Sequence, residues 1–489
     1  MSVPINLDEM NLHRFAERFS NLSSSDMIPF PNREGVTVIV KITNTQWAAV
    51  CLRLLLLHSE STIQIIAVPG KHNLPSIRHL FTEDDPISFW QYESGVDLIN
   101  KALSEVSTPF AALLEDRVLV TPQWLSRLIW PFYDDENVMI ASPMSPAEAL
   151  DGQQVVPCQS LQELYRYVSD NNQKDRGIWR TVQVFTGPCL LFRKSLLDVI
   201  GGMDPQLRSR PLKIADWCLR ARQKDCKLAL CEDVYVHAVH SIYFDDFSPT
   251  VWDPFCTKWG LREMDKDLNV LIERDAASFP LLPSFPLRKD NFSPPLVTAV
   301  VLLRDDNEME RWLHFKEEQT YANVHWILIR YSIERFEGFA FPVAISAGQI
   351  DAVILLHEAG DWKRGLDAAL KLAKGTYNVY FSAEHKYPPN YMERMVDLLF
   401  RESSDIAAAN LFEHEGGLIQ PSSEPLLLPL DCIAHRNTDE VGSFLYGKSS
   451  SLFLLPNSSR SIVYWNDELT ANQEEKFAGW GSGYEILDF

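Results

Sequence analysis

The chain lacks the features that would mark a membrane or secreted protein. Its most apolar early stretch, 50–57, is short and contains Arg53, so it fits a buried helix or strand better than a membrane span. The N-terminus has no basic segment followed by a long apolar run, which is the pattern of a secretion signal. We therefore expect no integral membrane segment and a cytoplasmic location.

Regularly spaced cysteines are also missing. The sequence has 8 cysteines, and no two of them stand at the two-residue spacing of a zinc knuckle or a redox motif. Scattered cysteines of this kind favour buried thiols in a reducing compartment. The sequence therefore predicts neither a zinc centre nor a disulfide framework.

An excess of positive charge is absent as well. Lys and Arg number 45 against 66 Asp and Glu, a net charge of -21 that repels nucleic-acid backbones and anionic lipids. The chain also has no phosphate-cradling glycine loop, no serine nucleophile elbow and no zinc-binding histidine spacing, so hydrolase, kinase and metalloprotease functions have no residues to support them. We expect no nucleic-acid partner.

What the chain does have is the size and composition of a multidomain globular protein. Its 489 residues exceed what one compact core normally holds. The hydrophobic share of 46% and the charged share of 23% are those of ordinary folded proteins. Two or three domains are expected.

The two halves of the sequence follow a similar pattern. Apolar runs at 36–40 and 297–303 each begin a strand, helix, strand unit. A proline follows the third predicted strand of each half, and the distances Val36 to Pro122 and Val297 to Pro389 are 86 and 92 positions. A duplicated chain is therefore expected.

This pattern predicts four segments along the chain. Residues 1–33 form a helical arm, because Leu12, Phe15, Phe19 and Leu22 recur at helical spacing. The arm either packs on its own domain or docks a partner. Domain 1 then covers 34–280, a proline-rich linker covers 281–295 and domain 2 covers 296–489.

One segment carries an ordered set of motifs. Between 186 and 241 the chain reads Thr-Gly-Pro, then Gly-Gly-Met-Asp, then Asp-Trp-Cys-Leu-Arg, and finally a strand that ends at His237. This order resembles glycosyltransferase family 2. The resemblance implies for both halves a GT-A fold, an α/β Rossmann-like architecture with mixed, mostly parallel sheets that binds a nucleotide sugar at the carboxyl ends of its strands.

The resemblance also implies a donor site in domain 1. Thr43 and Asn44 match the pair near the nucleobase, Asn100 matches an asparagine ahead of the third strand, and Glu115-Asp116-Arg117 occupy the acidic turn. In the family this turn holds a divalent metal, Mn²⁺ or Mg²⁺, that neutralises the leaving diphosphate.

Arg117 stands where the family has a second metal-binding aspartate. A guanidinium cannot bind a cation, but its forked donors can pair with a diphosphate. Alternatively, Glu115 and Arg117 form a solvated ion pair at the strand end. Both interpretations remain open.

The acceptor side retains a single carboxylate. Asp216 either acts as the general base on an acceptor hydroxyl or holds the loop in place. His237 is either a ligand of the metal, beside Asp116, or a structural hydrogen-bonding group. In domain 2 the acidic motifs are further altered, and Trp480 either stacks on a sugar of the donor or packs in the core.

Two classes of function follow. In the first, domain 1 transfers a sugar from a nucleotide-sugar donor to a glycan, protein or cell-envelope acceptor. In the second, the chain is a catalytically impaired relative that serves as a binding or assembly module for an active glycosyltransferase. A partner glycosyltransferase or a second copy of the chain would then be its partner.

Overall fold

The chain divides into two compact units. The computed structural model describes residues 35–59, 62–70, 75–148, 152–156, 161–172, 177–207, 209–239, 249–261, 280, 285–287, 292–303, 306–331, 350–356, 362–382, 387, 389–401, 406–409, 426–428, 433–436, 453–455, 462–465 and 484–487. Unit 1 comprises Met1–Tyr92 and Asp97–Phe292, and unit 2 comprises Glu93–Val96 and Ser293–Phe489.

Unit 1 alternates strands and helices. Its strands are β1 (Val36–Ile42), β2 (Ile63–Pro69), β3 (Ile87–Phe89), β4 (Phe110–Glu115), β5 (Val118–Leu119), β6 (Val138–Met144), β7 (Trp179–Val182), β8 (Cys189–Arg193), β9 (Lys227–Tyr235) and β10 (His237–Ala238). Its helices are α2 (Thr45–His58), α3 (Pro75–Arg78), α4 (Leu98–Ser104), α5 (Trp124–Leu128), α6 (Pro131–Asp134), α7 (Leu161–Asn172), α8 (Ser195–Ile200), α9 (Arg210–Arg222) and α10 (Pro249–Trp259).

Eight described strands of unit 1 form one large mixed sheet, and β5 and β10 form a separate pair. Its order is β3-β2-β1-β4-β8-β6-β9-β7, in which β8 and β7 run opposite to the other strands. The central strands are apolar runs buried on both faces, as expected for parallel strands covered by helices. The expected α/β class with mixed, mostly parallel sheets is confirmed.

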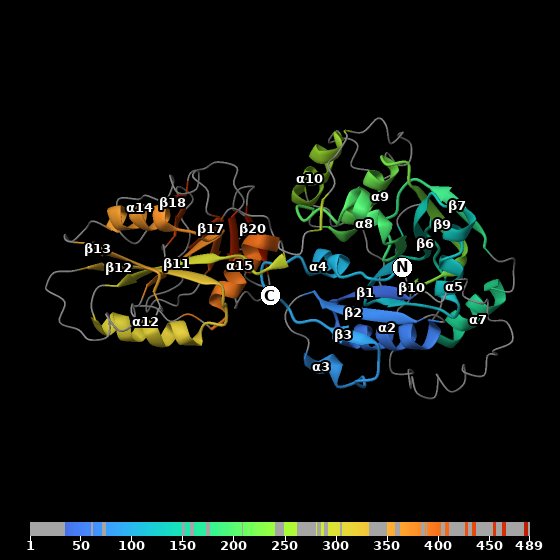
Figure 1. Cartoon of the computed structure of the whole chain (residues 1–489), viewed down its shortest axis with the longest axis horizontal. Helices are drawn as coiled ribbons and strands as arrows, with labels where there is room; N and C mark the ends of the chain where they lie inside the picture. Colours follow the sequence, from blue (N-terminus) through green and yellow to red (C-terminus); the bar gives the residue numbers. More distant parts are fainter. Residues whose placement is uncertain are drawn as a thin grey trace. The chain divides into compact units, whose positions relative to one another are not determined.

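The first helix of unit 1 begins directly after the central strand. Asn44 caps α2, because its Oδ1 accepts from the backbone N–H groups of Gln46 and Trp47 at 3.0 and 3.1 Å. Figure 1 shows α2 on one face of β1 and β2 and α4 on the other. Because β1 and β4 are parallel neighbours, the loops that follow them emerge at the same edge of the sheet.

Unit 2 is built in the same manner. Its strands are β11 (Val297–Leu303), β12 (Val324–Tyr331), β13 (Ala352–Leu356), β14 (Tyr377–Ser382), β15 (Ile406–Ala409), β16 (Leu426–Leu428), β17 (Ile433–Arg436), β18 (Phe453–Leu455), β19 (Ile462–Trp465) and β20 (Tyr484–Leu487). Its helices are α12 (Asp306–Glu318), α14 (Trp362–Leu372) and α15 (Tyr391–Arg401). Figure 1 shows α12 and α14 on opposite faces of the sheet.

The two large sheets share an arrangement through seven strands. The order β13-β12-β11-β14-β17-β15-β19 repeats β3-β2-β1-β4-β8-β6-β9, with β17 and β8 as the reversed strands. The eighth strands differ, because β20 is parallel to its neighbour and β7 is antiparallel. The resemblance between the halves thus extends from sequence to topology.

Two expectations fall on parts of the chain that are not described. The arm at 1–33 and Trp480 both lie outside the described residues. The cut between the units, after Phe292, falls inside the expected linker 281–295, and the short segment Glu93–Val96 belongs to unit 2.

The described helices are short, and most of the described cysteines are buried. Within the described ranges, no helix is long and apolar enough to cross a membrane. Within the described residues six cysteines form no disulfide, and five of these six are buried. Burial raises the pKa of the Cys218 thiol to about 12, so it stays protonated and unreactive at neutral pH.

Candidate functional site

The carboxyl ends of β1 and β4 meet at one turn. Asp116, which follows β4, accepts hydrogen bonds from the backbone N–H groups of Thr43 and Asn44, and Thr43 Oγ1 donates to Asp116 Oδ1 at 3.0 Å. The carboxylate of Asp116 is only 1% exposed. The structure thus brings together the three residues that the sequence placed at the nucleobase pair and the acidic turn.

The Asp116 carboxylate is committed to this turn. Burial raises its pKa, and the hydrogen bonds from Asn44 and Thr43 and the charge of Arg117 act in the opposite direction. A carboxylate that accepts backbone hydrogen bonds within a buried turn has its oxygens directed at the protein. Asp116 therefore stabilises the turn rather than presenting an open ligand.

Arg117 is the next residue on this turn. Its Nε is buried and has no hydrogen-bond partner among the described residues. Its backbone oxygen accepts from Val239 N at 3.1 Å, next to the short pairing of β5 with β10. The side chain is half-buried at the carboxyl edge of the sheet, and the pairing of its neighbours fixes its position.

Glu115 pairs with a residue that the sequence interpretation did not consider. Its Oε1 lies 2.7 Å from Nη1 of Arg210, at the start of α9. The expected Glu115–Arg117 ion pair is not seen in the described part of the chain. The carboxylate of Glu115 is thus neutralised by a residue of α9 and not by Arg117.

Asn100 acts within the scaffold. Its Nδ2 donates to the backbone oxygen of Met203 at 2.8 Å, and its Oδ1 accepts from Met203 N at 2.8 Å. A Cβ added at Gly202 would lie 2.3 Å from Asn100 Oδ1, so the glycine permits this close approach. Asn100 therefore connects α4 to the loop between α8 and α9, and it is buried there.

Asp216 is enclosed on every side. Its side chain is 0% exposed, with Oδ2 at 2.9 Å from Arg220 Nε and Oδ1 at 2.5 Å from Lys258 Nζ. Trp259 Nε1 donates to Oδ1 at 3.1 Å. Because both oxygens are occupied and no solvent reaches them, this geometry favours the loop-holding interpretation over the general base.

His237 is also buried, at 2% exposure. Its Nδ1 lies 3.2 Å from the hydroxyl of Tyr235, and its Nε2 has no partner among the residues described. Burial lowers the pKa of its imidazole to about 4, so the ring is neutral at physiological pH.

A divalent metal does not fit the side chains at this edge. No group of three or more His, Cys, Asp or Glu residues in the described ranges is arranged to hold a metal ion. Asp116 is bound to its own turn and Glu115 to Arg210, so the carboxylates expected at the metal are already used. Mn²⁺ or Mg²⁺ therefore has no ligand set in the described part of the chain.

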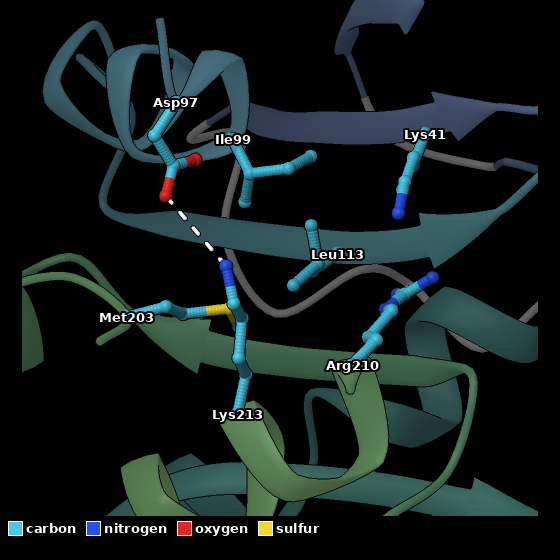
Figure 2. A pocket seen from close by; sticks show the side chains of 7 residues that line it. All are labelled: Lys41, Asp97, Ile99, Leu113, Met203, Arg210 and Lys213. Atoms are coloured by element: carbon cyan, nitrogen blue, oxygen red, sulfur yellow. Dashed lines mark ion pairs between the residues drawn. The ribbon is translucent and has the colours of Figure 1, made fainter. Parts of the chain in front are cut away.

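The sequence interpretation missed a cluster of cations beside the turn. A small cavity of about 60 Å³ is lined by Lys41, Asp97, Ile99, Leu113, Met203, Arg210 and Lys213. Figure 2 shows the Lys41 and Arg210 side chains converging on it. One signal was present in the sequence, because Lys41 interrupts an otherwise apolar strand, Val36–Ile42.

Comparison with known protein families and with curated proteins finds no match for the chain. Glycosyltransferases are among the solved structures that are similar to the chain. They include GalNAc-T7 with UDP, GalNAc and Mn²⁺ (11% identity, TM-score 0.35, 46% of this chain and 49% of that one). The mannosyltransferase PcManGT from Pyrobaculum calidifontis, with GDP-Man and Mn²⁺, has 13% identity and a TM-score of 0.33 over 50% of this chain and 68% of that one.

A third similar structure is residues 1–349 of TarS from S. aureus, with 13% identity and a TM-score of 0.25 over 31% of this chain and 50% of that one. The chain thus spans about half the length of GalNAc-T7 and of this part of TarS.

Proposed function

We propose that unit 1 is a glycosyltransferase-like domain that binds a nucleotide-sugar donor without a divalent metal and transfers the sugar to a glycan, protein or cell-envelope acceptor. In this proposal Thr43 and Asn44 form the turn beside the nucleoside, and Arg117 neutralises the diphosphate. Trp480 and the whole of unit 2 have no assigned role in it.

The observation that carries this proposal is the state of Arg117. Its Nε is buried without a partner among described residues, directly after Asp116 on the turn that joins β4 to β5. An unpaired buried guanidinium N–H is unfavourable in the free protein, and an anionic ligand would relieve that cost. Arginine also matches the geometry of diphosphate oxygens.

Calorimetric titration of the full chain with UDP- and GDP-sugars tests the proposal. Binding is expected with and without EDTA, and Arg117→Ala is expected to weaken it about tenfold or more, because a charge-assisted hydrogen bond is lost. Arg180→Ala is the matched control, since Arg180 is exposed and pairs with Glu232 on the far edge of the sheet. Unchanged affinity in Arg117→Ala would refute the metal-free donor site.

The enclosed Asp216 favours a second candidate, a non-catalytic relative that binds the donor or a partner glycosyltransferase but transfers nothing. The variant Asp216→Asn distinguishes a catalytic role of Asp216 from a purely structural one. If Asp216 only holds the structure, the variant loses about 3–5 kcal/mol of stability, because the buried Arg220 loses its carboxylate partner and Lys258 keeps only Asp204. Urea unfolding of wild type and variant measures this loss.

Asp135→Asn provides the control for that experiment. Asp135 pairs with Lys227 at 2.6 Å near the surface, so its removal is expected to leave the unfolding midpoint almost unchanged. Donor turnover is followed in parallel by release of nucleoside diphosphate. A stable Asp216→Asn protein that binds donor and has lost turnover would instead identify Asp216 as the base.

A further inference from the structure

The cation cluster lies on one face of the central sheet, between the sheet and two helices. Lys41 comes from β1, Arg210 and Lys213 from the first turn of α9, and Asp97 from the start of α4. Figure 2 shows Lys41 and Arg210 pointing toward each other across the cavity, with Leu113 on the sheet between them. All of these residues belong to unit 1.

Among the residues that line this cavity, positive charge exceeds negative charge. Its lining contains three cations and one carboxylate, and that carboxylate, Asp97, is 3.8 Å from Lys213 Nζ. Glu115, just outside the lining, pairs with Arg210 at 2.7 Å. Lys41 Nζ has neither an ion pair nor a hydrogen bond within the described residues, so its charge is not compensated by a direct partner.

Two further donor groups are available at the cavity. The contact of Arg210 Nη1 with Glu115 lacks hydrogen-bond geometry, and this buried nitrogen has no hydrogen-bond partner in the described part of the chain. Ser209, the N-cap of α9, makes no side-chain capping bond, and a 13-residue helix presents its positive end here. Helix N-termini favour anions because their first N–H groups are unsatisfied.

The size of the cavity limits what can occupy it. Its volume of about 60 Å³ is far below the roughly 300 Å³ or more of a pocket for a drug-sized ligand. The cavity therefore suits one tetrahedral oxyanion group better than a whole sugar ring or nucleoside.

We infer that the cavity between β1 and the α9 N-terminus is an oxyanion site, in which Lys41, Arg210 and Lys213 bind one phosphate-type group. The group is either free inorganic phosphate or the terminal phosphoryl group of a larger molecule whose remainder lies outside the cavity. This site does not depend on the donor site proposed at Arg117. Its ligand class follows from the charges, the donors and the volume alone.

The state of Lys41 supports the inference. Burial, and then the charges of Arg210 and Lys213, lower the pKa of Lys41 to about 8, although Asp97 and Asp116 act in the opposite direction. A lysine with a lowered folded-state pKa destabilises the fold at pH values below that pKa, since the unfolded chain binds its proton more tightly. Without an anionic ligand, the charged Lys41 therefore lowers the stability of the fold at neutral pH.

The test measures thermal unfolding and calorimetric binding of the full chain in sulfate, with chloride of equal ionic strength as reference. Sulfate is the probe because its charge does not change between pH 6 and 10. Saturable stabilisation by sulfate is expected. Lys41→Met is expected to raise the melting temperature in chloride and to lower sulfate affinity about tenfold or more.

Lys227→Met is the matched control, because Lys227 is surface-exposed and pairs with Asp135 away from the cavity. It is expected to retain wild-type sulfate affinity. Lys213→Met serves as a second variant, since Lys213 lies at the rim with a side chain 22% exposed, and it is also expected to weaken sulfate binding. Sulfate affinity that is unchanged in both cavity variants, or no sulfate effect beyond that of chloride, overturns the inference.

Competition distinguishes the two sources of the group. If the ligand is a terminal phosphoryl group, UDP or GDP displaces sulfate from the wild type. Lys41→Met then weakens the binding of sulfate and the binding of the nucleotide. If the ligand is free phosphate, inorganic phosphate displaces sulfate and the nucleotides do not. Sulfate binding in Arg117→Ala remains at wild-type strength in either case, which separates this site from the proposed donor site.

Discussion

At the scale of single residues, two buried histidines give the protein a defined sensitivity to acid. Burial lowers the pKa of both His58 and His237 to about 4. Between the unfolded value near 6.5 and this folded value, the unfolded chain binds protons that the folded chain does not. Stability is therefore fully present above about pH 6.5 and is lost as the pH falls toward 4.

The expected loss is up to about 1.4 kcal/mol per pH unit for each histidine inside that window. His237→Gln removes one titrating group and should make the dependence of the urea midpoint on pH shallower between pH 6.5 and 4.5. His79→Gln is the control, because His79 is exposed. Identical slopes for wild type and His237→Gln would show that His237 does not remain neutral in the folded protein.

The sequence allowed part of the candidate site to be predicted at this scale. The family resemblance placed Thr43, Asn44 and Asp116 at one donor site, and Asp116 is hydrogen-bonded to the other two. The partners of Glu115 and Asp216 were not predictable, since Arg210 and Lys258 approach them from distant parts of the chain. Long-range pairs of this kind depend on helix packing, which local patterns do not specify.

At the scale of elements, the turn between α8 and α9 depends on one glycine. Gly201 has a backbone φ of +73°, which residues other than glycine rarely adopt. A Cβ at this position would lie 1.8 Å from the backbone oxygen of Phe285. Arg220 binds the same turn, with Nη1 on Ile200 O and Nη2 on Gly202 O at 2.6 and 2.7 Å. Backbone hydrogen bonds from Gly202 N to Phe285 O and from Phe285 N to Ile200 O attach the segment 285–287 to this turn.

Gly201→Ala is therefore expected to lose about 3 kcal/mol or more of stability, because strain and a backbone clash act together. Gly260→Ala is a matched control with φ +60° and no atom closer than 3.8 Å to the added Cβ, so only the strain of about 1–2 kcal/mol applies. Chemical unfolding of both variants measures the difference. Equal losses would mean that the strand-like contact with Phe285 can shift to accept a methyl group.

The elements themselves were largely predictable where apolar runs are buried on both faces. The strands at 36–42 and 297–303 show this clearly, since each is the centre of its sheet. The two-residue pair β5 and β10 was not predictable, because Val118–Leu119 is too short for any periodic pattern. The position of this pair depends instead on the ends of β4 and β9, which β5 and β10 follow in the chain.

At the scale of the whole molecule, the two units have separate sheets and separate cores. Separate cores predict more than one unfolding transition. In scanning calorimetry, Gly201→Ala is expected to lower the temperature of one transition and to leave the other unchanged. A single transition whose calorimetric and van't Hoff enthalpies agree would show instead that the units unfold as one.

The lysine inside β1 has a consequence for how this sequence varies among its relatives. A methionine or isoleucine at position 41 would suit the apolar strand better, so random drift removes the lysine wherever nothing selects for it. Lys41 and Arg210 should accordingly be retained or lost together across descendants of the same ancestor. A lineage in which position 41 becomes apolar while position 210 remains basic would show that the two residues are not retained for a common reason.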